Sequence, residues 1–275
     1  MLRPETEHKL ARFLKAISNV EVSTEQNRID LAKNPDFDAY SAFYSLDSYR
    51  SGYVTQADLH DFLLSHKLSP TQQDIDLVIE TFDKNRDGKL SYSEFLNIVL
   101  PADAELRRQA TQKSYGPPYS PIFVPKNVML ELGLLFESEI NGLKMINVLR
   151  QELLESYDWS LKAAFRTIDT DDVGSIDRSS LVAFFRRNNI GATREEVSAV
   201  LRRLDKDSDG RWIFAEFAEA FHPDGKFGNE DIIGRLSATE RLSQRSRSSS
   251  PGRRTNRSRS NSFAYIIRLL NGAIC

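Results

Sequence analysis

Apolar residues recur along this chain at the spacing of one helical face, in short runs on both sides of four polar, glycine-containing stretches. Side chains three and four positions apart lie on the same side of an α-helix. The pattern therefore predicts a helix before and after each polar stretch. The residues concerned are Phe43, Leu46, Leu59, Phe62 and Leu63; Ile75, Val78, Ile79, Phe82, Phe95, Ile98 and Val99; Leu161, Phe165, Ile168, Leu181, Phe184 and Phe185; and Val197, Val200, Leu201, Leu204, Phe217 and Phe221.

Further helices are predicted in the first 34 residues. An amphipathic helix is expected from Pro4 to Val20. Ser23 and Gln26 have the spacing of a capping box, so a second, short helix should open there and stop before Pro35. We expect both helices to pack on the first group of core helices; the alternative is that the first helix fills a groove of that group as a built-in target. Its apolar face consists of Leu10, Phe13, Leu14 and Ile17.

The middle of the chain predicts a linker followed by a long helix. A polar helical stretch should run from Pro101 to about Lys113. The proline-rich segment 115–125 cannot sustain a helix, which indicates an extended linker or a docking strap. A helix of about 30 residues is expected next, weakened at Gly142 and too highly charged to span a bilayer. Its apolar positions are Val128, Leu132, Leu135, Leu143, Ile146, Leu149 and Leu153.

Two of the polar stretches, Asp83–Glu94 and Asp205–Glu216, match the twelve-residue pattern D-x-[DN]-x-[DN]-G-x5-E. With this pattern the chain resembles the EF-hand superfamily and its calmodulin-like members. Calcium takes about six to eight hard oxygen ligands, which such a loop supplies from positions 1, 3, 5, 7, 9 and 12. The resemblance therefore implies two Ca²⁺ sites.

The resemblance also assigns the ligands, with a main-chain carbonyl at position 7. They are Asp83, Asn85, Asp87, the Lys89 carbonyl, Ser91 and Glu94 in the second loop, and Asp205, Asp207, Asp209, the Arg211 carbonyl and Glu216 in the fourth. Gly88 and Gly210 occupy position 6, where the chain turns sharply. Leu90 and Trp212 occupy position 8, where the resemblance implies a short strand paired with the neighbouring loop. Ile213 stands at position 9 of the fourth loop, so water has to fill that direction.

A related loop with fewer ligands lies 36 residues before each of these two. In the first loop Tyr49 replaces a ligand at position 3, and Asp58 at position 12 is one methylene shorter than Glu. We therefore expect weak calcium binding there, or a preference for Mg²⁺. In the third loop Val173 removes a ligand and Ser180 removes the final carboxylate, so we expect no calcium. These degenerate loops should serve mainly as structural partners of the intact ones.

The expected fold class is all-α, with two EF-hand pair lobes, short β pairing between loops and a helical insert between the lobes. The expected parts are N-terminal helices over 1–34, a first pair over 36–100 (loops 47–58 and 83–94), the linker and long helix over 101–157, a second pair over 158–222 (loops 169–180 and 205–216), and a tail over 235–275. With 275 residues, of which 40% are hydrophobic, the chain is long enough for two small cores.

The resemblance implies a calcium-sensor or regulatory protein. In sensor members calcium opens the helix pairs, and core residues then line a groove for a target protein or peptide helix. Only three Met occur in the chain, which favours a narrow range of partners. The four His show no zinc spacing, and no catalytic motif is present, so we expect no enzyme activity.

The C-terminal region has a different composition. Residues 235–275 hold nine Arg and one Glu, a net charge of +8, so residues 1–234 carry −10 of the total of −2. This Arg/Ser-rich segment is expected to be disordered by itself. Two interpretations of its charge stay open: binding of an anionic partner such as RNA, lipid, a cytoskeletal filament or the chain's own acidic lobes, and a solvated tail with no specific ligand. A short apolar end, Phe263–Leu270, is long enough to seat in an EF-hand groove but not to cross a membrane.

The expected location is the cytoplasm, with a cytoskeletal or ciliary setting as an extension of it. The chain has one Cys, which suits a reducing compartment, and its first residues show neither a signal peptide nor a myristoylation site. Two alternatives to a sensor stay open: a structural calcium-binding component of a cytoskeletal or ciliary assembly with a cytoskeletal partner, and nucleic-acid binding through the Arg/Ser tail.

Overall fold

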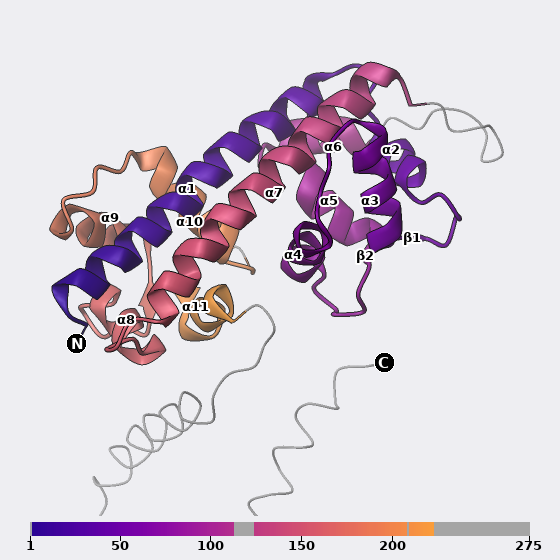
Figure 1. Cartoon of the computed structure of the whole chain (residues 1–275). Helices are drawn as coiled ribbons and strands as arrows, with labels where there is room; N and C mark the ends of the chain where they lie inside the picture. Colours follow the sequence, from indigo (N-terminus) through magenta and orange to yellow (C-terminus); the bar gives the residue numbers. More distant parts are fainter. Residues whose placement is uncertain (1, 113–123, 208, 223–275) are drawn as a thin grey trace, which may run out of the picture. The chain divides into compact units, whose positions relative to one another are not determined.

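A computed structural model describes residues 2–112, 124–207 and 209–222, all of which belong to one unit of the chain. These residues form eleven α-helices and four two-residue strands (Figure 1). The elements are α1 (Pro4–Lys33), α2 (Ala39–Leu46), β1 (Tyr53–Val54), α3 (Gln56–Ser65), α4 (Gln72–Phe82), β2 (Leu90–Ser91), α5 (Tyr92–Val99), α6 (Ala104–Gln112), α7 (Lys126–Leu154), α8 (Leu161–Ile168), β3 (Ser175–Ile176), α9 (Arg178–Arg187), α10 (Arg194–Leu204), β4 (Trp212–Ile213) and α11 (Phe214–Phe221). The all-α fold class is thereby confirmed, and the predicted tail lies outside the described residues.

Helices α2 to α5 form a first helix–loop–helix pair, and α8 to α11 form a second. In each pair the two loops are joined by a short antiparallel ladder. Val54 pairs with Leu90 in the first, and Ile176 pairs with Trp212 in the second. The expected strand at position 8 of each loop is therefore present, and it links one intact loop to one degenerate loop.

Local sequence explains where the helices begin. Thr71 and Thr193 cap α4 and α10, each accepting a hydrogen bond from the main-chain N–H three residues later while the acid at that position bonds back. The outgoing helices α3 and α5 begin in the same way, with Thr55 and Ser91 as caps. Because these two caps stand at position 9 of their loops, the residue at position 12 is also the third residue of a helix.

The part of the chain that the structure describes has two hydrophobic cores, one for each pair. The apolar positions predicted from periodicity are buried or partly buried in them. The predicted long helix is present as α7, continuous over 29 residues. It serves both cores, because Leu132, Leu135 and Phe136 pack in the first while Ile146 and Leu153 pack in the second.

Two predictions about the N-terminal region are wrong. No break occurs near Ser23, because α1 is a single helix of 30 residues with neither Gly nor Pro after its first turn. Its apolar face packs neither on nor in the first pair: Leu10, Phe13 and Ile17 lie in the core of the second pair, and only the C-terminal end around Leu31 reaches the first.

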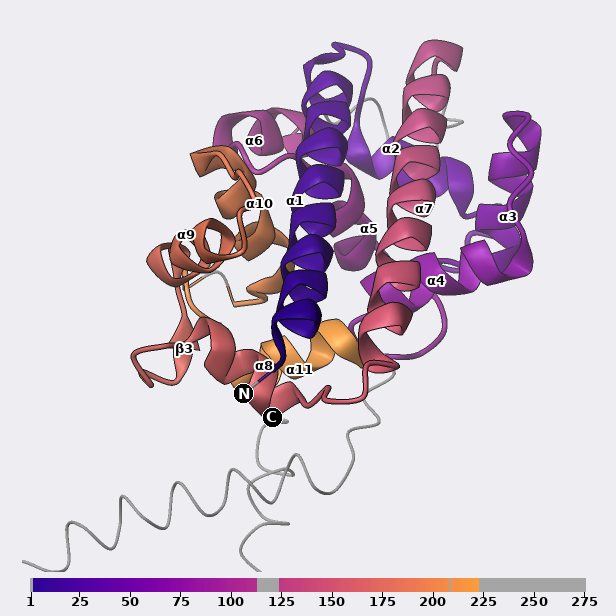
Figure 2. The same cartoon turned by 60° about the vertical axis from the view of Figure 1, so that its left-hand side comes forward.

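The placement of α1 follows from its antiparallel pairing with α7 (Figures 1 and 2). Near one end the Lys9 ammonium donates to the Glu152 carbonyl at 3.4 Å, and near the other the Asn34 amide donates to the Glu131 carboxylate at 2.9 Å. A helix of this length spans about 45 Å. The start of α1 therefore lies beside the end of α7, next to the second pair.

In both helices one set of residues recurs at an alternating spacing of four and three, which is typical of a helix–helix seam. They are Leu10, Leu14, Ile17, Glu21, Thr24, Arg28 and Leu31 in α1, and Val128, Leu132, Leu135, Glu139, Gly142, Ile146, Leu149 and Leu153 in α7. All are buried or partly buried, the charged ones included. Among the described residues, no helix is both long enough and apolar enough to cross a bilayer.

Candidate metal centres in the four loops

All four loops share one local geometry, built on the Asp at position 1 and the Gly at position 6. The Asp carboxylate accepts a hydrogen bond from the Gly N–H at 2.7 to 2.8 Å in every loop. The four glycines have φ between +79° and +84°, a left-handed conformation that only glycine adopts freely. The pairs are Asp47 with Gly52, Asp83 with Gly88, Asp169 with Gly174, and Asp205 with Gly210.

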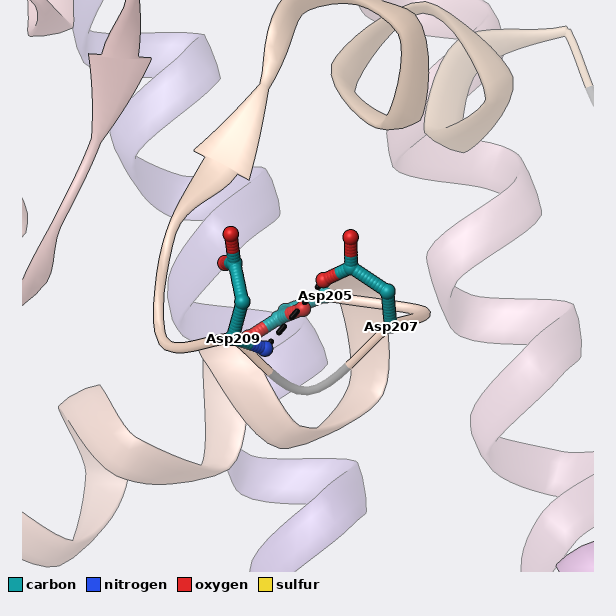
Figure 3. A group of neighbouring side chains, drawn as sticks. All are labelled: Asp205, Asp207 and Asp209. Atoms are coloured by element: carbon teal, nitrogen blue, oxygen red, sulfur yellow. Dashed lines mark hydrogen bonds between the residues drawn. The ribbon is translucent and has the colours of Figure 1, made fainter.

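The fourth loop brings three carboxylates together. One oxygen each from Asp205, Asp207 and Asp209 lies within 4.8 Å of the other two. Figure 3 shows these side chains grouped between the end of α10 and the strand β4. Asp207 accepts from the Asp209 N–H at 3.2 Å, and Asp209 accepts from the Arg211 N–H at 2.7 Å, which holds each side chain in place.

Glu216 joins this loop from the first turn of α11. Its two oxygens accept from the Lys206 N–H at 2.9 Å and the Ile213 N–H at 3.0 Å. The carboxylate is buried and thus turned toward the loop rather than toward solvent. Arg211 directly precedes β4, as the expected carbonyl ligand at position 7 should.

In the second loop the side chains bond in the same pattern. Asp83 accepts from the Arg86 N–H at 2.6 Å, Asn85 accepts from the Asp87 N–H at 2.9 Å, and Asp87 accepts from the Lys89 N–H at 3.2 Å. Lys89 directly precedes β2, and its ammonium lies 3.6 Å from the ring centre of Tyr53, a cation–π distance.

Glu94 closes the second loop and caps α5 with the same carboxylate. One oxygen accepts from the Lys84 N–H at 2.8 Å, and the other accepts from the Ser91 N–H at 2.9 Å and the Ser91 hydroxyl at 2.6 Å. Burial raises the pKa of Glu94, but these hydrogen bonds lower it by a larger amount. The net pKa of Glu94 therefore lies below its ordinary value. The carboxylate is therefore held in its charged form.

The degenerate first loop retains part of this arrangement. Asp58 caps α3 through the Thr55 N–H at 3.0 Å and still reaches the Ser48 N–H, at 3.3 Å. Tyr49, at position 3, is almost fully exposed and supplies no carboxylate. The first loop thus has acids at positions 1 and 12 only.

The third loop has lost its closing acid. Asp177, at position 9, caps α9 by accepting from the Ser180 N–H at 2.8 Å and from the Ser179 hydroxyl at 2.7 Å. These hydrogen bonds lower the pKa of Asp177. Val173 points into solvent. In the third loop Asp177 thus caps the outgoing helix, and Asp169 holds the turn through the Gly174 N–H.

Sequence reasoning missed two features of these loops. Ser91 has the role of helix cap in addition to its assigned ligand role, a double use that the S-x-x-E spacing of a capping box could have indicated. The residues at position 4 of the first three loops, Arg50, Arg86 and Asp172, adopt left-handed φ of 52°, 61° and 54°. Arginine has no preference for this left-handed conformation, so the sequence does not indicate it at Arg50 and Arg86.

The donor set of the fourth loop fits calcium. Two oxygens bound to one ion at 2.3 to 2.6 Å can lie up to about 5 Å apart, and the three Asp oxygens lie within that limit. Oxygen ligands, a buried position 12 acid and the adaptable loop suit Ca²⁺ better than transition metals, which prefer nitrogen and sulfur. In the second loop Glu94 takes the same position as Glu216 in the fourth, with hydrogen bonds from the N–H groups at positions 2 and 9.

Comparison with known proteins agrees with the geometry. A family model described as an EF-hand domain pair matches residues 36–100 and 160–222. The probable calcium-binding protein CML11 of Oryza sativa subsp. japonica is 26% identical over 178 residues, which cover 65% of this chain and 63% of that protein. The probable calcium-binding protein CML18 of Arabidopsis thaliana is 25% identical over 178 residues, covering 65% of this chain and 79% of its own length.

A more distant likeness extends to animals. Troponin C, isoform 1, of Balanus nubilus is 21% identical over 176 residues, covering 64% of this chain and 82% of that protein. The chain thus spans somewhat less than two thirds of the rice relative and more of the other two.

Proposed function

Because this chain is a calmodulin-like EF-hand protein with two EF-hand pairs, we propose that it is a calcium-responsive regulatory protein in which the second and fourth loops bind the ion. The observation that carries the proposal is the convergence of three Asp oxygens in the fourth loop, closed by the buried Glu216. The names of the relatives support calcium binding in general; the choice of these two loops rests on their donor sets.

The response we propose follows from where the position 12 acids sit. Glu94 and Glu216 belong to the first turns of α5 and α11, so bidentate ligation would pull each outgoing helix toward its loop. A change in the angle between incoming and outgoing helix is the usual result in sensor EF-hands. Such a change would alter contacts with a target protein or peptide helix.

The surfaces that would change are already covered by the chain's own helices. Phe62 of the first pair lies against Phe136 of α7, with ring centres 6.0 Å apart. Phe221 of the second pair lies against Phe13 of α1 at 5.0 Å. We therefore propose that calcium shifts the pairs relative to α1 and α7, rather than opening an empty groove.

Titration calorimetry of the intact protein tests the calcium sites. We expect the unaltered protein to bind two calcium ions. Glu94→Gln and Glu216→Gln should each bind only one, because an amide cannot replace a bidentate carboxylate. Glu105→Gln, an exposed substitution of the same kind on α6, is the matched control and should leave uptake unchanged. The absence of uptake below about millimolar calcium would refute the proposal.

A second function is favoured by the shared packing of α1 and α7 in both cores. Helices that fasten both pairs suit a structural calcium-binding component, for which we propose a cytoskeletal or ciliary assembly. An apolar dye separates the two functions. A regulatory protein should increase the dye fluorescence when calcium is added, whereas a structural component should leave it constant.

A further inference from the structure

Three Glu and three Arg form a buried ionic network where α1, α7 and α10 meet. Glu21 contacts Arg28 at 2.9 Å, Arg202 at 2.9 Å and Arg203 at 3.0 Å. Glu139 contacts Arg28 at 2.8 Å and Arg203 at 2.7 Å. Glu139 is fully buried, and Glu21 and Arg28 are nearly so. Glu21 and Glu139 thus each bridge the arginine of α1 to an arginine of α10.

The network reaches the second loop through α5. The Arg28 Nε donates to the Ile98 carbonyl at 2.9 Å, and Ile98 lies in the helix that leaves the second loop. Glu25, which contacts Arg28 at 3.1 Å, also accepts from the Ala102 N–H at 2.7 Å, just beyond that helix. The end of the outgoing helix of the second loop is therefore bonded to Arg28 directly, and the segment just beyond it is joined to Arg28 through Glu25.

The network reaches the fourth loop through α10. Arg203 stands two residues before Asp205, the first expected ligand, at the end of the incoming helix. A cavity of about 400 Å³ borders the network, and Lys84 and Lys206, at position 2 of the second and fourth loops, both line it. The two loops therefore begin on the walls of one cavity.

Buried charges resist separation from their partners, because an unpaired buried charge is costly. Burial raises the pKa of Glu21, but the charges of Arg28 and Arg203 together lower it by a larger amount. The Glu21 carboxylate therefore stays charged. A displacement of α5 would draw the Ile98 carbonyl away from Arg28. Since Arg28 and Arg203 share both carboxylates, the rearrangement would reach α10.

We propose that calcium binding at the second loop and at the fourth loop is cooperative across the two EF-hand pairs, with the Glu21–Arg28–Glu139–Arg203 network as the coupling element. This inference rests on the proposed use of these two loops. The cooperativity is positive. The first ion loosens the shared network, so less free energy is needed to rearrange it when the second ion binds. Coupling is reciprocal and typically amounts to a change in affinity of roughly 5- to 150-fold.

The experiment uses the full chain with Trp159→Phe, which leaves Trp212 of the fourth loop as the sole tryptophan. Calcium is titrated while Trp212 fluorescence is recorded, with and without Glu94→Gln in the second loop. We expect Glu94→Gln to weaken calcium binding at the fourth loop on the order of tenfold. An effect below about twofold would overturn the proposal.

The network itself is tested with Arg203→Met combined with Glu139→Gln, which keeps the net charge and leaves an oxygen for Arg28. In this background Glu94→Gln should change the affinity of the fourth loop by less than about twofold. The matched control is Arg108→Met with Glu105→Gln, the same exchange in an exposed ion pair of α6, in which the tenfold effect should persist. Persistence of the effect in the network variant would contradict the mechanism.

Arg203→Lys provides a second variant if the double substitution does not fold. Lysine keeps the charge but cannot contact both carboxylates as a planar fork, so the effect of Glu94→Gln should be reduced. Failure of the coupling and failure of the proposed function give different results. Calcium uptake at two independent loops overturns only the coupling, whereas the absence of uptake in calorimetry overturns both.

Discussion

At position 12, side-chain length decides how well a loop is closed. Glu94 and Glu216 accept from the N–H at position 2 of their loops at 2.8 and 2.9 Å. Asp58 makes the same contact at 3.3 Å while it also caps its helix. The shorter side chain of Asp58 thus makes a longer hydrogen bond to the loop while it caps the helix. This supports the expectation of weak calcium binding in the first loop, or of a preference for Mg²⁺.

Restoring the first loop should add a calcium site. Tyr49→Asp with Asp58→Glu supplies the missing acid at position 3 and the longer acid at position 12, and Glu can still cap α3. Calorimetry should then show three calcium ions per chain, against the two that we expect for the unaltered protein. Tyr49→Asp alone is the control and should leave two strong sites. A stoichiometry that stays at two in the double variant would contradict this reading of the loop.

Glu21 should make stability depend on acid pH. Its pKa is lowered in the fold, so its contribution is complete above about 4.5 and is lost as the pH falls through the lowered value. At pH 7, Glu21→Gln should reduce the free energy of unfolding by roughly 3 to 5 kcal/mol, because it leaves buried arginines short of a partner. Urea unfolding should show this difference shrinking below about pH 4.5.

Glu152→Gln, on the exposed side of α7, is the control for that measurement and should differ little from the unaltered protein at every pH. A difference for Glu21→Gln that stayed constant down to about pH 2 would show that its carboxylate does not contribute through its charge.

At the scale of the elements, α1 and α7 approach each other closely at Gly142. A Cβ placed on Gly142 would lie 2.4 Å from Val20 Cγ1, closer than any real contact. The same glycine that weakens a helix by propensity therefore permits the close approach of two helices. The sequence indicated the weakness at Gly142 but not the reason for it, since Val20 is 122 positions away.

Gly142→Ala should destabilise the protein by roughly 1 to 3 kcal/mol, although alanine favours a helix by about 1 kcal/mol. Val20 is β-branched and stiff, so it cannot turn aside. Urea unfolding followed by circular dichroism measures the change. In a Val20→Ala background the same substitution should be neutral or stabilising, and a destabilisation of equal size there would argue against the steric cause.

The helices and loops were predictable because their signals are local. Apolar spacing, capping residues and the twelve-residue pattern all lie within a few positions of each other. The path of α1 was not predictable in this way, because its apolar face packs against residues more than 100 positions away. One available signal was missed: Glu21 and Arg28 continue the four–three spacing of Leu10, Leu14 and Ile17, which indicated one continuous helix with charges in its seam.

At the scale of the described unit, two cores share two helices. Both tryptophans, Trp159 and Trp212, lie in or beside the second core, so their fluorescence reports on that core alone. Circular dichroism reports on the helices of both pairs. Because α1 and α7 are common to both cores, we expect the pairs to unfold together.

Unfolding in urea should therefore give coincident transitions by tryptophan fluorescence and by circular dichroism. Phe13→Ala, which empties a buried position against Phe221, should shift both curves equally and reduce the free energy of unfolding by roughly 3 to 5 kcal/mol. Separate midpoints for the two probes would show that the pairs are independent.

The antiparallel course of α1 and α7 also governs how this molecule can be dissected. A fragment ending near residue 100 would keep α1 but lose both α7 and the second core, leaving Leu10, Phe13 and Ile17 without neighbours. A fragment starting near residue 158 would lack Phe13, whose ring centre lies 5.0 Å from that of Phe221. We therefore expect neither half to fold by itself, so recombinant work on either pair should begin from a polypeptide that includes residues 4–33 and 126–154.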